Sequence, residues 1–145
     1  MTKLFRILFI ALFIIGCDSE DTQRNPYLQE LGFRFDINTN LPLYSPLTNT
    51  GNALYFPEHN GGIRGFFVMN LGFDNYIAFE ASCPNHAPND CSTMKLNGST
   101  VICSCEDYEY TLANGLMINR PDGIKVYDLL NYRTQVSGNV ISVFN

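Results

Sequence analysis

Short apolar segments alternate with turn sequences along most of this chain, and that spacing restricts its fold more than any other feature. Asn97-Gly98 and Ser137-Gly138 are two of the turns, and such pairs favour the positive φ of tight reversals. Between the turns lie seven strand-length segments, at residues 33–37, 53–56, 65–70, 75–80, 100–103, 131–136 and 139–144. Regular short strands at this spacing predict an all-β protein, either an antiparallel sandwich or a small barrel.

The N-terminus has the pattern of a bacterial secretion signal. Lys3 and Arg6 precede an apolar run over residues 7–15, which is too short to span a bilayer. The run leads into Ile14-Ile15-Gly16-Cys17, which resembles a bacterial lipobox, where cleavage before the cysteine leaves a thiol that carries diacylglycerol. We expect residues 1–16 to be a lipoprotein signal peptide, Cys17 to be the lipid attachment site, residues 17–32 to be a tether and residues 33–145 to be a β domain.

The expected anchor predicts a location in the bacterial cell envelope. Acyl chains on Cys17 would supply the membrane affinity, with the domain in the periplasm or at the cell surface. Residues 18–21 are Asp-Ser-Glu-Asp and resemble the surface-export signals of some bacterial lipoproteins; a solvated linker is the other interpretation. The formal net charge of -5 argues against a nucleic-acid binder, which needs a basic surface. The expected partners are therefore the membrane, through the lipid, and an envelope protein.

Four more cysteines follow at positions 83, 91, 103 and 105. An even number in an exported chain points to disulfide bonds, because that compartment is oxidising. Four cysteines allow three pairings, and their spacing does not choose among them. No nucleophile–base pair, phosphate-binding loop or pair of catalytic carboxylates stands out in the sequence, so we expect no enzyme and assign no catalytic residue.

The segment around these cysteines resembles a Rieske domain. That family holds a [2Fe–2S] cluster with two cysteines on one iron and two histidines on the other. Its ligand loops carry Cys-x-His and Cys-x-x-His and are joined by a hairpin. Here Cys83 matches the first cysteine and Cys103 matches the second. The resemblance extends over residues 55–144 and implies a Rieske-like antiparallel β-sandwich or small barrel with a cysteine-bearing two-loop subdomain.

The two histidine positions of that pattern are changed in this chain. Asn85 stands at the first, with His86 one residue later, and Glu106 stands at the second. One residue advances an extended chain by about 3.3 Å, which moves the imidazole away from the ligand position. A carboxylate is a hard donor, unlike the soft ligands that iron–sulfur clusters prefer. We therefore expect no cofactor; if a cluster is bound, its ligands would be Cys83, His86, Cys103 and Glu106.

The resemblance also implies a disulfide arrangement. In some Rieske proteins a second cysteine in each loop ties the loops together, and Cys91 and Cys105 occupy similar places. Without a cluster, Cys83 and Cys103 would face each other across the loop tips and oxidise. This gives Cys83–Cys103 with Cys91–Cys105, while the swapped pairing Cys83–Cys105 with Cys91–Cys103 stays open.

Three functions compete at this point. The preferred one is a lipid-anchored, exported Rieske-fold domain that has lost its iron–sulfur cluster and acts as a disulfide-stabilised binding or structural lipoprotein. The alternative is a Rieske-type [2Fe–2S] electron-transfer protein with atypical ligands. The third is thiol–disulfide exchange at Cys103-Ser104-Cys105, which is disfavoured because the acidic residues Glu106, Asp107 and Glu109 oppose a thiolate.

Overall fold

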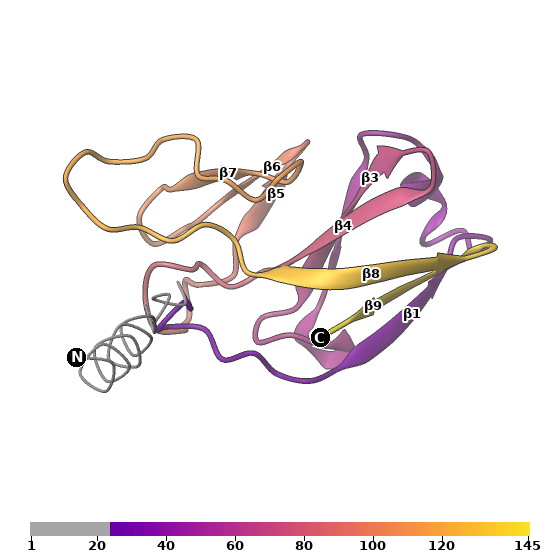
Figure 1. The fold of residues 1–145 in the computed structure, drawn as a ribbon, viewed down its shortest axis with the longest axis horizontal. Helices are drawn as coiled ribbons and strands as arrows, with labels where there is room; N and C mark the ends of the chain where they lie inside the picture. The colour runs from indigo at the N-terminus through magenta and orange to yellow at the C-terminus, as the bar shows by residue number, and fades with distance from the viewer. Residues whose placement is uncertain (1–23) are drawn as a thin grey trace, which may run out of the picture.

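A computed structural model describes residues 24–145, so the expected signal peptide and Cys17 lie outside the described residues. The fold is almost entirely antiparallel sheet, with a large sheet and a smaller one beside it (Figure 1). The strands are β1 (Arg34–Asn38), β2 (Ala53–Phe56), β3 (Phe66–Gly72), β4 (Asn75–Glu80), β5 (Lys95–Asn97), β6 (Thr100–Ile102), β7 (Glu109–Thr111), β8 (Asn131–Ser137) and β9 (Val140–Phe144). Two 3-10 turns, η1 (Ser45–Thr48) and η2 (Glu58–Asn60), flank β2.

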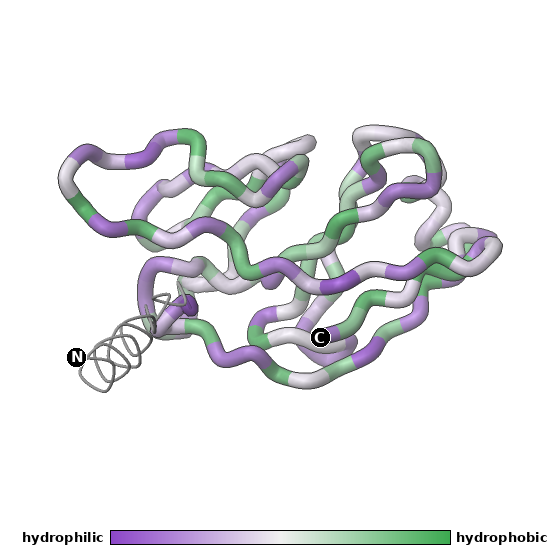
Figure 2. Tube along the Cα trace, in the orientation of Figure 1, coloured by the Kyte–Doolittle hydropathy of each residue, from purple (hydrophilic) through white to green (hydrophobic). Residues whose placement is uncertain are grey.

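The large sheet is a half-barrel. Its strand order is β1-β9-β8-β4-β3-β2, and it curls until the rings of Phe35 on β1 and Phe56 on β2 have centroids 5.8 Å apart. Alternation of hydrophobic and hydrophilic residues along the strands directs one face inward (Figure 2). The enclosed core consists of Ile37, Leu47, Phe56, Phe66, Val68, Ala78, Tyr132, Ile141 and Val143. Burial of each large apolar side chain contributes about 1.5–3 kcal/mol, which holds the curled sheet closed.

A three-stranded sheet, in the order β5-β6-β7, forms a subdomain on the outer face of the half-barrel. Strand β3 is buried on both faces, because Phe66 and Val68 point into the half-barrel while Phe67 and Met69 pack against the subdomain. Gly115 lies against the ring of Phe79, where a Cβ atom would come within 2.5 Å of a ring carbon. The chain can approach the outer face of the sheet this closely only with glycine there.

Residues 25–28, near the start of the described chain, lie on the subdomain. The Asn25 side chain donates to the Pro84 carbonyl over 2.7 Å and accepts from the Tyr27 and Leu28 amides. Leu28 is itself buried. Residues 25–28 therefore fix the chain beside the first cysteine loop. Among the described residues, 24–145, no helix is long and apolar enough to cross a membrane.

The predicted all-β antiparallel architecture with a cysteine-bearing two-loop subdomain is confirmed. Each of the seven expected strands is present within a few residues of its predicted bounds. Strands β5 and β7 were not predicted, because three residues are too few to show a period of two. They form only because β6 lies between them and pairs with both.

Candidate functional site

Two loops of the subdomain carry all four described cysteines. The first loop leaves β4 and is closed at its base by backbone hydrogen bonds from Cys83 to Ser92 and from Met94 to Ala81, both 2.8 Å long. The second loop follows β6, and the Cys103 amide donates to the Tyr108 carbonyl over 2.9 Å. Both loop bases therefore continue the strands, so the sheet sets the positions of Cys83 and Cys103.

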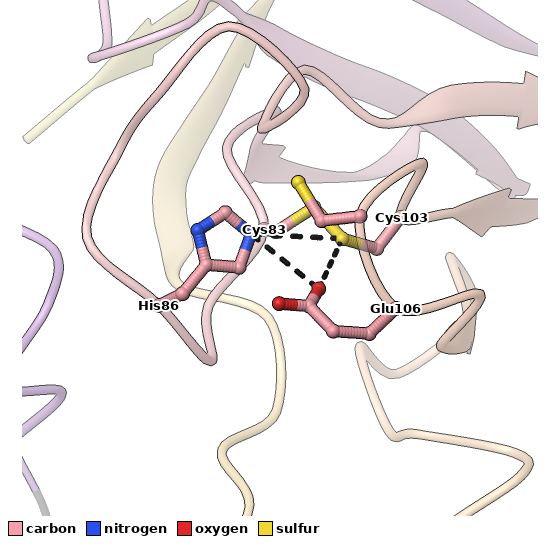
Figure 3. Close-up of side chains that lie close together, drawn as sticks. Cys83, His86, Cys103 and Glu106 are labelled. Carbon is pink, nitrogen blue, oxygen red and sulfur yellow. Dashed lines mark hydrogen bonds and ion pairs between the residues drawn. A yellow bond between two sulfur atoms is a disulfide. The ribbon is translucent and has the colours of Figure 1, made fainter.

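Two disulfide bonds join the loops. Cys83 is bonded to Cys103, and Cys91 is bonded to Cys105 (Figure 3 draws the first pair). The inner pair, Cys83–Cys103, is fully buried, whereas Cys91 of the outer pair is exposed. The disulfide bonds expected from the even cysteine count are present, in the pairing that the family resemblance implied. Cys103 and Cys105 are bonded to separate partners in the first loop, so the Cys103-Ser104-Cys105 stretch contains no disulfide of its own.

His86 and Glu106 flank the inner disulfide (Figure 3). His86 Nε2 lies 3.4 Å from Glu106 Oε2 and 3.8 Å from Cys103 Sγ, and Glu106 Oε2 lies 2.9 Å from the same sulfur. The sulfur in a disulfide carries no hydrogen, so this last distance is a packing contact. Each of Cys83, His86, Cys103, Cys105 and Glu106 offers one potential ligand atom, and these five atoms lie within 4.8 Å of one another. The four residues named from the sequence as cluster ligands are thus brought together.

Asn85, at the first histidine position of the Rieske pattern, links three segments. Its amide nitrogen donates to the Tyr110 hydroxyl over 2.8 Å and to the Tyr127 carbonyl over 2.9 Å, and its oxygen accepts from the Tyr127 amide over 2.7 Å. Burial raises the pKa of Tyr110 well above its ordinary value, so its hydroxyl stays protonated even in alkali that would ionise a free tyrosine. The Asn85 side chain therefore links the first loop to β7 and to the segment before β8 by three hydrogen bonds.

The arrangement of these residues differs from the ligand set of a Rieske cluster in three respects. The cluster needs two cysteine thiolates, and Cys83 and Cys103 are bonded to each other. It also needs two imidazoles, whereas the second histidine of the chain, His59, lies in η2 and lines a different, largely apolar pocket with Tyr44 and Tyr55. Cysteine and histidine ligands belong to different irons in that cluster, but His86 Nε2 and Cys103 Sγ are separated by only 3.8 Å.

A cavity of about 710 Å³ is separate from the cysteine loops. It lies between residues 24–30 and the segment leading into β8, and it contains two ion pairs. Arg24 pairs with Glu30 at 3.2 Å, and Arg120 pairs with Asp128 at 2.6 Å. Sequence reasoning missed this cavity because its two walls are about a hundred residues apart in the chain. Each of these two arginines is thus paired with a neighbouring carboxylate.

No protein-family model and no curated protein matches this chain. Solved structures similar to it include the cyanobacterial plasma membrane Rieske protein PetC3 from Synechocystis PCC 6803, at 23% sequence identity and a TM-score of 0.47. That match covers 63% of this chain and 84% of the other. A chain from the complex of reduced oxygenase and oxidized ferredoxin in carbazole 1,9a-dioxygenase is similar at 16% identity and a TM-score of 0.47, covering 80% of this chain and 94% of the other.

Proposed function

We propose that this chain is an exported, lipid-anchored domain of the bacterial cell envelope, with a Rieske-like scaffold whose ligand loops are held by disulfides in place of an iron–sulfur cluster. Its role is that of a binding or structural lipoprotein. The observation that carries the proposal is the Cys83–Cys103 disulfide, which joins the two loop tips at the residues matching the family's cysteine ligands. Sulfurs bonded to each other offer no thiolate to iron.

The two disulfides make a bound metal unnecessary for holding the loops. They span 20 and 14 residues of chain, and each bridge of this size contributes about 3 kcal/mol in the chain-entropy model. Small domains have a total free energy of unfolding of about 5–15 kcal/mol. The bridges therefore supply a large share of the free energy of unfolding of this domain.

The attachment to the membrane rests on the lipobox that ends in Cys17. Asn25 is fixed to Pro84 in the first cysteine loop, so only a short segment separates the expected lipid from the loops. Fully extended, this segment reaches at most about 30 Å. In the proposed arrangement the cysteine loops lie within this distance of the membrane.

A second candidate is a Rieske-type electron-transfer protein with atypical ligands. It is favoured by one observation, the gathering of His86 and Glu106 around the sulfurs of Cys83 and Cys103. It requires both cysteines to be reduced and a carboxylate to replace an imidazole on the outer iron. The two candidates therefore differ in the redox state of a single cysteine pair and in the presence of iron and sulfide.

The test uses the full chain, processed and exported by a bacterial host and purified in detergent without reductant. Intact-mass spectrometry, iron and acid-labile sulfide assays and electron paramagnetic resonance are then applied to the same sample. We expect a mass lower by four hydrogens than that of the thiol form, with no iron and no sulfide. Two irons and two sulfides per chain would overturn the proposal in favour of electron transfer.

The lipid anchor needs its own experiment. Cells are grown with a radiolabelled fatty acid, and we expect label in the wild-type chain but none in the Cys17→Ala variant. The Cys91→Ala variant is the matched control, because its cysteine lies in the folded domain and should leave labelling unchanged. Equal labelling of wild type and Cys17→Ala would refute the anchor.

A further inference from the structure

We infer that the Cys83–Cys103 disulfide masks a site for one divalent metal ion of the zinc type, which forms when a dithiol reduces that bond. The ligands would be the two cysteine sulfurs, His86 Nε2 and a Glu106 carboxylate oxygen. This inference goes beyond the proposed function, which concerns only the oxidised protein. It rests on the positions of four side chains from two loops.

The distances suit one tetrahedral ion. Zinc binds thiolate sulfur at about 2.3 Å and imidazole nitrogen or carboxylate oxygen at about 2.0–2.2 Å, which puts neighbouring ligand atoms about 3.3–3.8 Å apart. The His86–Glu106 distance of 3.4 Å and the His86–Cys103 distance of 3.8 Å lie in this range. The Cys103–Glu106 distance of 2.9 Å is shorter, and rotation of the Glu106 side chain, which is 31% exposed, can lengthen it.

One contact favours the histidine tautomer that a metal requires. His86 Nδ1 lies 2.9 Å from the Ala87 carbonyl oxygen, and because a carbonyl only accepts hydrogen bonds, this contact is a hydrogen bond when Nδ1 carries the hydrogen. In the neutral ring this leaves the lone pair on Nε2, the nitrogen that faces Cys103 and Glu106 (Figure 3). A backbone carbonyl that fixes the ring in this way is the usual outer partner of a metal-bound histidine.

The donor set favours zinc over the hard cations. Two thiolates, one imidazole and one carboxylate match the sulfur, nitrogen and oxygen ligands of tetrahedral zinc sites, whereas calcium and magnesium take oxygen ligands. Cys83 and Cys103 are fully buried and the His86 side chain is only 17% exposed, so the ion would be largely shielded from water. These three ligands thus lie in a largely buried site, and reduction must part the two bonded sulfurs before both can bind the ion.

The redox step balances with a dithiol as the reductant. The dithiol gives two electrons and two protons to the Cys83–Cys103 bond, becomes a disulfide itself and leaves two cysteine thiols. Binding of the divalent ion then forms two metal–sulfur bonds and releases both thiol protons to solvent. The outer pair, Cys91–Cys105, is nearer the surface and is reduced as well, so the experiment must separate the two pairs.

Cobalt(II) is the probe, because thiolate-to-cobalt charge transfer and intense visible bands report a tetrahedral sulfur-containing site. The full exported chain is titrated with cobalt before and after reduction by a phosphine, which becomes the phosphine oxide with oxygen from water. We expect no cobalt in the oxidised protein and one tetrahedral cobalt per reduced chain, displaced by zinc. Absence of cobalt uptake by the reduced chain would overturn the inference.

Variants assign the ligands. His86→Ala and Glu106→Gln should each weaken zinc binding at least tenfold, since even outer partners of metal ligands contribute 10- to 100-fold. His59→Ala and Glu109→Gln are the matched controls and should leave the affinity unchanged, because neither side chain belongs to the ligand cluster. Equal affinities across all four would overturn the ligand assignment.

The double variant Cys91→Ser/Cys105→Ser separates the two cysteine pairs. It should keep one tetrahedral cobalt, because only Cys83 and Cys103 are then left to bind it. Loss of that signal would move the site to the outer pair and refute the inference. Far-ultraviolet circular dichroism follows the fold: if the reduced chain unfolds without metal, zinc should refold it, and a failure to refold would also refute the inference.

Discussion

The hydroxyl of Tyr132 on β8 donates a hydrogen bond to the buried carboxylate of Glu80, 52 residues earlier at the end of β4. Three backbone amides complete the carboxylate's partners: Ile63 at 2.7 Å, Arg64 at 2.9 Å and Ser82 at 2.8 Å. Four donors satisfy an anion that would otherwise be too costly to bury. Glu80 thereby fixes the point where the first cysteine loop leaves the half-barrel.

Replacing that carboxylate should destabilise the whole domain. In Glu80→Gln the new amide group would face backbone donors with donors of its own, and we expect the free energy of unfolding to fall by about 3 kcal/mol. Urea denaturation followed by circular dichroism measures the change. Glu58→Gln is the matched control, since Glu58 is exposed and lies 4.0 Å from Arg64; it should change stability by less than about 0.5 kcal/mol. Equal effects of the two variants would contradict this role for Glu80.

The raised pKa of Tyr132 predicts that the protein loses stability in alkali. Burial, and next the nearby Glu80 carboxylate, raise the pKa of Tyr132 above that of an unfolded chain, which is about 10. As the pH rises, Tyr132 therefore ionises first in the unfolded state. Its contribution to the free energy of unfolding is complete below pH 10 and is lost as the pH rises above 10. The expected slope is about 1.4 kcal/mol per pH unit for each such tyrosine. Urea titrations between pH 9 and 11 should show that the free energy of unfolding falls less steeply with pH in Tyr132→Phe than in the wild type. Parallel curves for the two proteins would contradict this role of Tyr132.

Asn85 should contribute stability across the cysteine loops. Asn85→Ala removes the partners of the Tyr110 hydroxyl and of both backbone groups of Tyr127, and we expect a loss of about 2 kcal/mol. The exposed turn residue Asn139 gives the control variant Asn139→Ala, which should be close to neutral. A double-mutant cycle with Tyr110→Phe should reveal coupling between the pair, and strict additivity would show that their hydrogen bond is energetically unimportant.

One substitution should stabilise the protein. Phe73 and Asp74 form the two-residue turn between β3 and β4, both with positive φ, and the Phe73 side chain is fully exposed. A left-handed conformation costs a bulky residue about 1–2 kcal/mol, and asparagine tolerates it far better. Phe73→Asn should therefore raise the free energy of unfolding by about 1 kcal/mol. A decrease in the urea midpoint would mean instead that the phenylalanine ring makes a stabilising contact.

The all-β architecture follows from local sequence, because strand alternation and turn chemistry depend on neighbours two to four residues apart. Phe66 and Phe67 show a feature that local alternation does not predict, namely burial on both faces of a strand. Adjacent residues on a strand point to opposite faces, and both of these are buried. The sequence cannot show that the outer face is covered, because the cover comes from the subdomain that follows β4.

The candidate site divides in the same way. Its candidate ligands, Cys83, His86, Cys103 and Glu106, were named from the sequence through the resemblance to the Rieske ligand loops, and the even cysteine count predicted disulfides. Only the tertiary structure decided that both loop tips converge, that the inner pair is Cys83–Cys103 and that His86 faces Glu106. Sequence also gave no sign of the Glu80–Tyr132 bond, since a buried carboxylate is stable only where donors from distant segments meet it. Local patterns determine which elements form, whereas contacts across 20 to 52 residues depend on how those elements pack.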